Sequence, residues 1–270
     1  MTPTNVISSQ DRLVLFGLGL FETLLISESG PLFSDLHWNR MKKGASFLNL
    51  KFPDQSEWTR LIQEFIRLNP ASFPFALRIT LSGGSPGTDL PAQLFFNVRP
   101  LPYRPEQYLR GIKLHLLSAP RNEHSPLVSI KSTNYLENLL AKETAVRYGA
   151  DEGIWLNTKG YLCEGTMSNL FFIKDNKLFT PSLASGCLPG TRRYTILELA
   201  DILNIPTEEG LYTVEELLAS DELFVTNALM GLMPVCCVND VSFTVSPPAA
   251  KDSLLRRLES AYKQKMSGYP

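Results

Sequence analysis

Three stretches between residues 130 and 200 decide the fold of this chain. They are IKSTNYLENLLAKE (130–143), DEGIWLNTKGYLCEGTMSNLFFIKDNKLFTP (151–181) and GCLPGTRRYTILELA (186–200). The first stretch places Lys131 directly before a segment with helical spacing. The second places Glu164 after a strand-like run, and the third begins a helix with Gly190, followed by a threonine and two arginines. A lysine, a glutamate and a glycine-led helix start therefore lie within one part of the chain.

These three groups have complementary chemistry. A lysine amine can bond covalently to an aldehyde, and a carboxylate can hold a pyridine nitrogen in its protonated form. The exposed amides and the dipole at the start of a helix bind a phosphate dianion. Together they are the protein groups that a pyridoxal phosphate enzyme requires.

The bulk composition excludes several classes of protein. The chain has 270 residues, of which 44% are hydrophobic and 20% charged, enough for two domains or one large one. The formal net charge is −1 and no basic block is present, so we expect no nucleic-acid partner and no membrane-surface binding. The first twelve residues lack the pattern of a signal peptide, and no apolar run reaches membrane-spanning length. We therefore expect a cytoplasmic protein.

The cysteines and histidines do not indicate a metal site. The spacing of the four cysteines matches neither a disulfide framework nor a zinc motif, and the three histidines are scattered. We expect free, partly buried thiols in a reducing compartment and no bound metal. The residues concerned are Cys163, Cys187, Cys236, Cys237, His37, His115 and His124.

The hydrophobic pattern predicts a small α+β domain over residues 1–104. Apolar and β-branched runs predict strands, and helical spacing predicts two helices, the first with Asp35 as its N-cap. The predicted strands are 13–16, 20–26, 75–81 and 93–98, and the predicted helices are 36–50 and 57–68. A glycine- and proline-containing loop, 82–91, separates the last two strands.

A proline-rich segment ends this domain, and residues 105–111 are predicted to be an interdomain linker. The larger C-terminal domain, 112–270, is predicted to mix strands and helices without strict βαβ alternation, which favours an α+β fold over a doubly wound sheet. Its predicted strands are 112–118, 153–156, 170–173, 178–180 and 222–225, and its predicted helices are 135–148, 191–203 and 251–263.

Five sequence strings together resemble the class IV family of pyridoxal phosphate enzymes, which includes branched-chain and D-amino-acid aminotransferases. They are LFGLGLFETLL (15–25), IKSTNYLENLL (130–140), DEGIWLNTKGYLCEGTMSNLFF (151–172), LPGTRR (188–193) and FVTNALMGLMPV (224–235). The last string resembles the aminodeoxychorismate lyase branch of the family. The resemblance runs from about residue 11 to residue 238. It implies fold type IV, with a small N-terminal α/β sandwich domain and a larger C-terminal pseudo-barrel domain.

The resemblance also implies roles for the residues near the reacting carbon. Lys131 is implied as the Schiff-base lysine, and its released amine as the general base for the proton beside the substrate nitrogen. Thr23 is implied to place a hydroxyl near the substrate, although a strand threonine without a role fits its local sequence equally well. Tyr135 is implied to contact the phenolic oxygen of the cofactor, although a core tyrosine on an amphipathic helix is an equal alternative.

Other residues are implied to hold the rest of pyridoxal 5'-phosphate. Glu164 is the implied partner of the pyridine nitrogen, and Ser168 and Asn169 continue the family pattern beside it. The phosphate is implied to bind the backbone of Thr191 and Arg192, the turn at Asn227 and Ala228, and Arg40 of the first domain. These placements imply a cofactor between the two domains. Without the family, Arg40 is a surface helix charge and Asn227 an ordinary strand-end residue.

Two departures from the family pattern stand near the N-terminus. Leu18 lies where relatives commonly carry aspartate, and the usual first strand before the pair at residues 11 and 12 is short or absent. The resemblance places the glycine-containing string 16–23 in a wall of the substrate pocket; it is not a dinucleotide-binding motif, because it lacks the third glycine.

The sequence favours a lyase over a transaminase. A transaminase must bind an α-carboxylate, and Arg78 and Arg99 are candidates for binding it. D-amino-acid relatives carry an arginine after the strand at 77–81, where this chain has Ser-Gly-Gly (82–84). We therefore predict an aminodeoxychorismate lyase that forms p-aminobenzoate and pyruvate in folate biosynthesis. The alternatives are a class IV aminotransferase for branched-chain or D-amino acids, and a non-catalytic cofactor-binding protein. The resemblance implies a homodimer.

Overall fold

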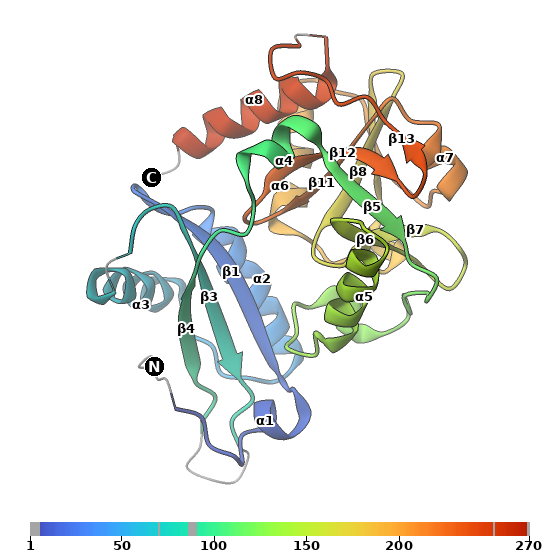
Figure 1. Cartoon of the computed structure of the whole chain (residues 1–270). Helices are drawn as coiled ribbons and strands as arrows, with labels where there is room; N and C mark the ends of the chain where they lie inside the picture. The colour runs from blue at the N-terminus through green and yellow to red at the C-terminus, as the bar shows by residue number, and fades with distance from the viewer. Residues whose placement is uncertain (1–5, 70, 86–90, 251, 269–270) are drawn as a thin grey trace. The chain divides into compact units, whose positions relative to one another are not determined.

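The computed structural model describes residues 6–69, 71–85, 91–250 and 252–268, and it divides into two compact units (Figure 1). The first unit contains the chain up to Pro102 together with Ile130–Tyr135. The second contains Tyr103–Ser129 and Leu136–Gly268. The segment predicted to be a linker, 105–111, contains helix α4 (Pro105–Arg110) and belongs to the second unit. The lysine-bearing segment belongs to the first unit because it pairs with a strand there.

The first unit is built on an antiparallel four-stranded sheet with the order β2-β1-β3-β4. Its strands are β1 (Gly19–Ser27), β2 (Gly30–Pro31), β3 (Phe75–Ser82) and β4 (Leu94–Arg99). Strand β2 pairs only with the end of β1, which leaves the start of that edge open. Residues 131–133 occupy it: Phe21 N donates to Lys131 O at 2.9 Å, and Thr133 N donates to Gly19 O at 2.9 Å.

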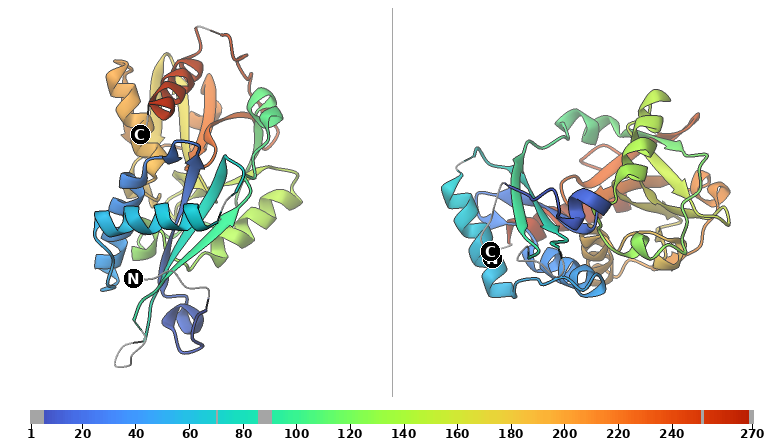
Figure 2. Two further views of the ribbon diagram at one scale, coloured as in Figure 1. Left: turned by 90° about the vertical axis from the view of Figure 1, so that its left-hand side faces the viewer. Right: turned by 90° about the horizontal axis from the view of Figure 1, so that it is seen from below.

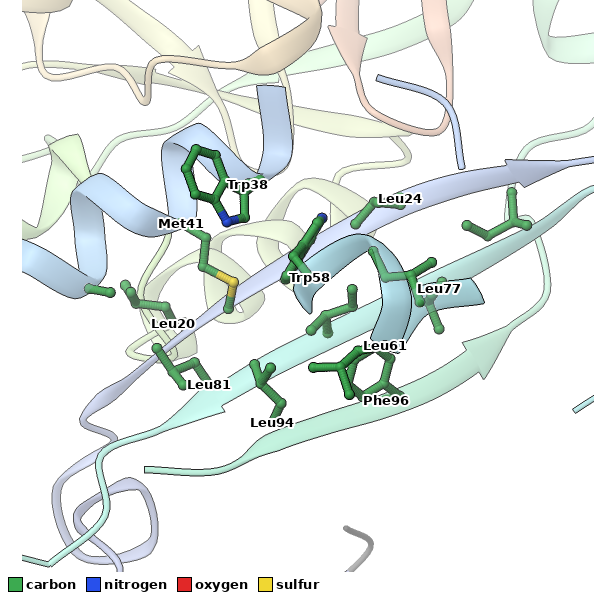
Figure 3. Packing of buried hydrophobic residues seen from close by; sticks show 14 of the residues in the cluster. Leu20, Leu24, Trp38, Met41, Trp58, Leu61, Leu77, Leu81, Leu94 and Phe96 are labelled. Atoms are coloured by element: carbon green, nitrogen blue, oxygen red, sulfur yellow. The ribbon is translucent and has the colours of Figure 1, made fainter. Parts of the chain in front are cut away.

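One face of this sheet forms the core of the first unit. Alternate residues of β1, which include Leu20 and Leu24, point toward helices α2 (Ser34–Phe47) and α3 (Gln55–Leu68). Figure 2 shows α3 lying across the strands, and Figure 3 shows Trp58 and Leu61 from this helix packed among strand residues. Because Leu61 is completely buried, its replacement by alanine is expected to cost about 2–5 kcal/mol.

Two local predictions in the first unit are wrong. Residues 13–16, predicted as a strand, lie in helix α1 (Arg12–Phe16), because Asp11 accepts a hydrogen bond from Leu13 N at 2.8 Å and Gly17 ends the helix with a left-handed φ of 66°. Asp35 does not cap α2. The N-cap residue is Phe33, and Asp35 lies in the first turn, where a carboxylate suits the helix dipole.

The second unit contains a nine-stranded sheet with the path β10-β9-β8-β11-β12-β5-β6-β7 and with β13 paired to β12. Strand β7 contacts β8 and β9 from the other half of the path, so the sheet curls into a half barrel. The strands are β5 (Ile112–Leu116), β6 (Glu152–Leu156), β7 (Leu162–Gly165), β8 (Asn169–Lys174), β9 (Lys177–Pro181), β10 (Thr207–Gly210), β11 (Glu222–Asn227), β12 (Gly231–Val238) and β13 (Val241–Ser242).

Helices surround this curled sheet. Helix α5 (Leu136–Arg147) packs on β6, and α8 (Leu254–Ser267) packs against α6 (Thr191–Ile202), β11 and β12, as Figure 1 shows for the red C-terminal helix. A short helix, α7 (Val214–Leu218), precedes β11. The helix predicted at 251–263 corresponds to α8, which begins at Leu254 and ends at Ser267. Residue 251, the first of the predicted range, lies outside the described residues.

The chain approaches Lys131 through a short helical turn. Pro126–Ser129 forms a 3₁₀ helix, and extended pairing begins only near Ser132, which forms a bridge with Leu20. Proline at the first position of a helical turn is well tolerated, because its missing N–H would have no partner there.

Several classes of site are absent from the described part of the chain. Within it, no helix combines the length and the apolar character needed to cross a membrane. The same residues contain no group of three or more His, Cys, Asp or Glu side chains that could hold a metal ion. The thiols of the four cysteines are free, and Cys163 and Cys187 are buried, as the sequence predicts.

Candidate cofactor site and substrate surface

Lys131 lies on the sheet face opposite the hydrophobic core of the first unit. Its Nζ is 4.5 Å from the ring centroid of Phe21 and 5.5 Å from that of Tyr135. The two rings meet edge to face, with centroids 5.1 Å apart. The lysine is half-buried, and aromatic faces attract a cation without fixing it in one direction. The amine therefore lies beside the faces of two aromatic rings.

The same face carries a threonine and two arginines. Thr23 lies two residues from Phe21 in β1, and the β1–β3 register pairs Thr23 with Arg78. The Arg78 guanidinium lies 3.7 Å from the Phe21 ring centroid. Burial lowers the pKa of Arg78, and the nearby positive charge of Arg99 lowers it further. The sequence candidates Lys131, Tyr135, Thr23 and Arg78 are thus brought together, with two cations placed to attract an anionic substrate group.

Arg40 occupies a different place in the first unit. Its Nε and Nη2 donate to the two carboxylate oxygens of Glu22 at 2.7 and 2.6 Å, and His37 Nδ1 lies 2.6 Å from the same carboxylate. Glu22 and His37 are fully buried between β1 and α2. Burial would raise the pKa of Glu22, but the charges of Arg40 and His37 and their hydrogen bonds lower it to about 2. The predicted phosphate contact of Arg40 stays a prediction.

Glu164 is a buried carboxylate held by several donors in the second unit. Its Oε2 accepts from Leu188 N at 2.9 Å and from Asn169 Nδ2 at 3.4 Å, and its Oε1 lies 3.3 Å from Arg121 Nη2. Asn169 Nδ2 also donates to Leu188 O at 2.9 Å. Asn169 therefore joins Glu164 to the start of the turn that leads into α6. This carboxylate is fixed in position and direction, as a partner for a ring nitrogen must be.

Arg121 is a functional candidate that the sequence reasoning missed. It follows β5, it is buried, and it also lies near Asn138 Oδ1 and Glu137. No motif surrounds it, because its partner Glu164 is distant in sequence and approaches only when β6 and β7 pair. The signal available in the sequence is weak: an arginine directly after a proline at a strand end.

The start of α6 has the features of an anion-binding turn. Gly190 is its N-cap and supplies no side-chain acceptor to the first turn, and a Cβ at Gly190 would lie 1.9 Å from Asn169 Oδ1. Thr191 Oγ1 is buried and makes no hydrogen bond. Arg193, the second of the two arginines in this turn, has a structural role: its Nη2 donates to Pro181 O at 2.9 Å and also contacts the Glu209 carboxylate.

The turn between β11 and β12 is the second predicted phosphate contact. Asn227 Oδ1 accepts from Leu229 N and Met230 N at 2.9 Å each, which closes the turn. Its Nδ2 donates to Tyr103 Oη at 2.8 Å and to Met167 O at 3.1 Å. The side chain of Asn227 is therefore a structural clamp, and any phosphate contact here falls to the backbone near Ala228.

Ser168 has a supporting place in the second unit. Its Oγ donates to the buried Glu152 at 3.4 Å, and Glu152 also accepts from the hydroxyl and the N–H of Thr166. A Cβ at Gly165 would lie 2.1 Å from Ser168 Oγ, so this glycine permits the tight turn after Glu164. Ser168 therefore shapes the loop that follows Glu164.

The residues of the second unit fit a phosphate-bearing cofactor with a ring nitrogen. The buried hydroxyls of Thr191 and Thr226 make no hydrogen bond, so they remain able to donate to an anion. The glycine cap at residue 190 leaves space at a helix start, and Glu164 is fixed as an acceptor. The role of Lys131 as the Schiff-base amine stays a prediction.

Several known proteins are similar to this chain over most of its length. Residues 19–238 match the family model described as amino-transferase class IV. The aminodeoxychorismate lyase of Bacillus subtilis is 29% identical over 244 residues, which cover 88% of this chain and 83% of that protein. A probable branched-chain-amino-acid aminotransferase of Thermotoga maritima is 30% identical over 238 residues, which cover 85% of this chain and 80% of that protein.

Solved structures give the same architecture. A proposed 4-amino-4-deoxychorismate lyase of Legionella pneumophila superposes with a TM-score of 0.86 at 29% identity, covering 97% of this chain and 96% of the other. The pyridoxal phosphate-bound form of a hypothetical aminotransferase from Mycobacterium tuberculosis gives 0.84 at 23% identity, covering 97% and 95%. The fold predicted from the sequence, fold type IV, is confirmed.

Proposed function

Because this chain belongs to the class IV amino-transferase family, we propose that it is a pyridoxal 5'-phosphate-dependent aminodeoxychorismate lyase. The reaction converts 4-amino-4-deoxychorismate to p-aminobenzoate and pyruvate, a step of folate biosynthesis. The second candidate is a class IV aminotransferase for branched-chain or D-amino acids, which the similarity to the Thermotoga maritima protein supports.

The cofactor and the chain have separate tasks in this proposal. When bound, pyridoxal 5'-phosphate would supply an aldehyde carbon that bonds to the substrate amine, and a ring that accepts the electron pair from the C–H bond of the substrate carbon bearing that amine. Lys131 Nζ takes the proton from this substrate carbon. The amine lies beside the rings of Phe21 and Tyr135, whose faces attract its cationic form. Glu164 holds the proton on the ring nitrogen.

The bond that breaks next distinguishes a lyase from a transaminase. In the lyase the electron pair left by the proton expels the enolpyruvyl oxygen, the six-membered ring becomes aromatic, and a proton added to the leaving group gives pyruvate. Aromatisation supplies much of the driving force, so the protein needs mainly to position the substrate and to move protons. In this proposal Arg78 and Arg99 bind the substrate carboxylates, and Thr23 supplies a hydroxyl beside them; the pairing of Thr23 with Arg78 and the proximity of the two arginines support these roles.

A single observation carries the lyase proposal. The β1–β3 register sets Thr23 opposite Arg78, on the face where Lys131 lies against Phe21. A hydroxyl, a guanidinium and an amine on one sheet face match a reaction that moves two protons on a carboxylated substrate.

The two candidates differ in their products. Purified holoenzyme incubated with 4-amino-4-deoxychorismate should form p-aminobenzoate and pyruvate in equal amounts. The matched reaction contains a branched-chain amino acid and 2-oxoglutarate, and it should leave the keto acid unaminated. Amination of the keto acid without release of p-aminobenzoate would establish the transaminase instead.

We also propose that the chain acts as a homodimer. Helix α5 exposes a run of large apolar side chains, with Leu136 67%, Leu139 47% and Leu140 53% accessible. In helix α1 of the other unit, Phe16 is 69% accessible and no residue is buried. Apolar faces of this kind usually mark an interaction surface. Sedimentation equilibrium should give twice the chain mass, and L139E/L140E should reduce it to a single chain mass if α5 lies in the interface.

A further inference from the structure

The turn at residues 227–231 is anchored from outside the strands that it joins. Asn227 closes it from within, whereas Tyr108 Oη in α4 donates to Met230 O at 2.9 Å. Arg192 Nη2, at the start of α6, donates to Ala228 O at 3.2 Å. The two predicted phosphate-binding elements of the second unit are therefore connected directly through one arginine side chain.

Arg192 is an unusual residue for this position because its side chain is almost completely buried. It is 1% exposed, although arginine is rarely found fully inside a protein. Its Nη2 donates to a neutral group, the Ala228 carbonyl, and its charge lies close enough to the Tyr262 hydroxyl to affect the pKa of that group. Taking a guanidinium out of water is costly unless its surroundings compensate for the lost hydration. A positive charge is thus held next to the turn that is proposed to receive a phosphate dianion.

Tyr262 connects this arginine to the C-terminal helix. Tyr262 lies in α8, is 4% exposed, and has its ring against Gly231, where a Cβ would lie 2.9 Å from the Tyr262 Cε1. Gly231 has a left-handed φ of 62°, so the turn needs a glycine for its conformation and for the room that the ring takes. Burial raises the pKa of the Tyr262 hydroxyl, and the neighbouring Arg192 charge partly opposes this.

We propose that Arg192 is a positioning residue for the cofactor phosphate: its side chain fixes the 227–231 turn through the Ala228 carbonyl, and Tyr262 of helix α8 holds that side chain in place. This inference rests on the proposed cofactor. It gives α8, which lies beyond the residues 19–238 matched by the family model, an indirect part in phosphate binding, through Arg192 and the turn. The role differs from the backbone contact that the family resemblance implies for Arg192.

The test measures binding of the cofactor to the apoprotein, without turnover. The dissociation constant of pyridoxal 5'-phosphate is compared with that of pyridoxal, which lacks the phosphate, for wild type, R192Q, Y262F and R193Q. Arg193 is the matched control, because it is the next residue of the same helix turn, is also buried, and contacts Pro181 and Glu209 instead of the turn. Circular dichroism and the melting temperature of each apoprotein report folding.

We expect R192Q to weaken the binding of pyridoxal 5'-phosphate about 10- to 100-fold and Y262F about 3- to 10-fold, with pyridoxal binding unchanged. R193Q should lower the melting temperature without this phosphate-specific loss. If R192Q does not fold, Y262F decides alone, because it removes one hydroxyl and keeps the ring against Gly231.

Two results would overturn the inference while leaving the proposed function intact. One is an equal loss for pyridoxal and pyridoxal 5'-phosphate, and the other is phosphate-specific binding that Y262F and R192Q leave unchanged. If wild-type protein binds no pyridoxal 5'-phosphate, the proposed function fails as well.

Discussion

The face that carries Lys131 and the segment that carries Glu164 hold their key residues by different means. Lys131 Nζ lies over the rings of Phe21 and Tyr135 at 4.5 and 5.5 Å. Glu164 is fixed by Leu188 N, Asn169 and Arg121. Ring faces attract a cation, whereas hydrogen bonds and an ion pair fix the place of the buried Glu164 carboxylate. The neighbours of the two groups therefore differ in kind, as do their proposed tasks: Lys131 is proposed to bond to the cofactor and to move a proton, and Glu164 to hold a proton on the ring nitrogen.

The largest expected effect comes from removing Lys131. K131A should lower turnover of 4-amino-4-deoxychorismate by about 10⁴-fold or more, because it removes both the proposed covalent attachment point and the proposed general base. The melting temperature of the apoprotein should stay within a few degrees of wild type, since the lysine is only half-buried. K174A, at an exposed strand end, is the matched control and should keep full activity.

The second-largest expected effect on turnover comes from changing Glu164. E164Q keeps the size of the side chain and an acceptor for Leu188 N, but it removes the negative charge. We expect turnover to fall about 10²- to 10³-fold while bound cofactor is retained, because a neutral amide no longer favours the protonated ring. Activity assays measure turnover, and the visible absorbance of the holoenzyme measures how much cofactor stays bound. Loss of cofactor together with activity would mean that Glu164 anchors the cofactor instead of tuning it.

The first unit also contains a fixed carboxylate, and it makes a prediction about pH. The folded-state pKa of Glu22 is about 2, below its ordinary value of 4.5, so its ionised form stabilises the folded protein fully above pH 4.5. This contribution, of order 3 kcal/mol, should be lost as the pH falls from 4.5 toward 2.

Urea unfolding of wild type, E22Q and the exposed-site control E28Q, at several pH values, measures that contribution. The stability difference between wild type and E22Q should shrink as the pH falls below 4.5, and E28Q should follow wild type throughout. A difference that is constant with pH would show that the buried ion pair of Glu22 and Arg40 does not control stability in acid.

The smallest expected effect is at Thr23, and it sharpens the choice of reaction. T23A should lower lyase turnover about 5- to 10-fold, as expected for the loss of one neutral hydrogen-bonding group, and T23S should restore most of it. The same change should leave the binding of pyridoxal 5'-phosphate unaffected. If T23A and T23S behave alike, the hydroxyl has no part in the reaction and the threonine is a strand residue only.

Much of this molecule is predictable from local sequence. Most strands and helices follow from hydrophobic periodicity, and the structure confirms them. The class IV resemblance rests on short motifs and implies fold type IV; the family match confirms the family and the solved structures confirm the fold. Strand β12 was not predicted, and Pro234 within it is a residue that argues against a strand. Pro234 is nevertheless accommodated opposite Phe224 of β11. Helix α1 was misread because five apolar-rich residues resemble a strand, and only its caps reveal the helix.

The unpredicted parts of the candidate site are pairs between distant residues. Arg121 meets Glu164, Arg40 meets Glu22, and Arg192 meets Ala228 only after the strands and helices have packed. A single sequence carries no record of which buried cation is nearest to which acceptor. Motif reasoning therefore identified Arg40 and Arg192 as residues of interest, and the structure shows which of their side-chain atoms are engaged and by what.

The most direct test of the whole account is where the cofactor bonds to the protein. The holoenzyme is reduced with borohydride, which makes the link between lysine and pyridoxal phosphate permanent, and its peptides are mapped by mass spectrometry. The account predicts a single pyridoxyl adduct, on Lys131. An adduct on any other lysine, or none at all, would contradict it.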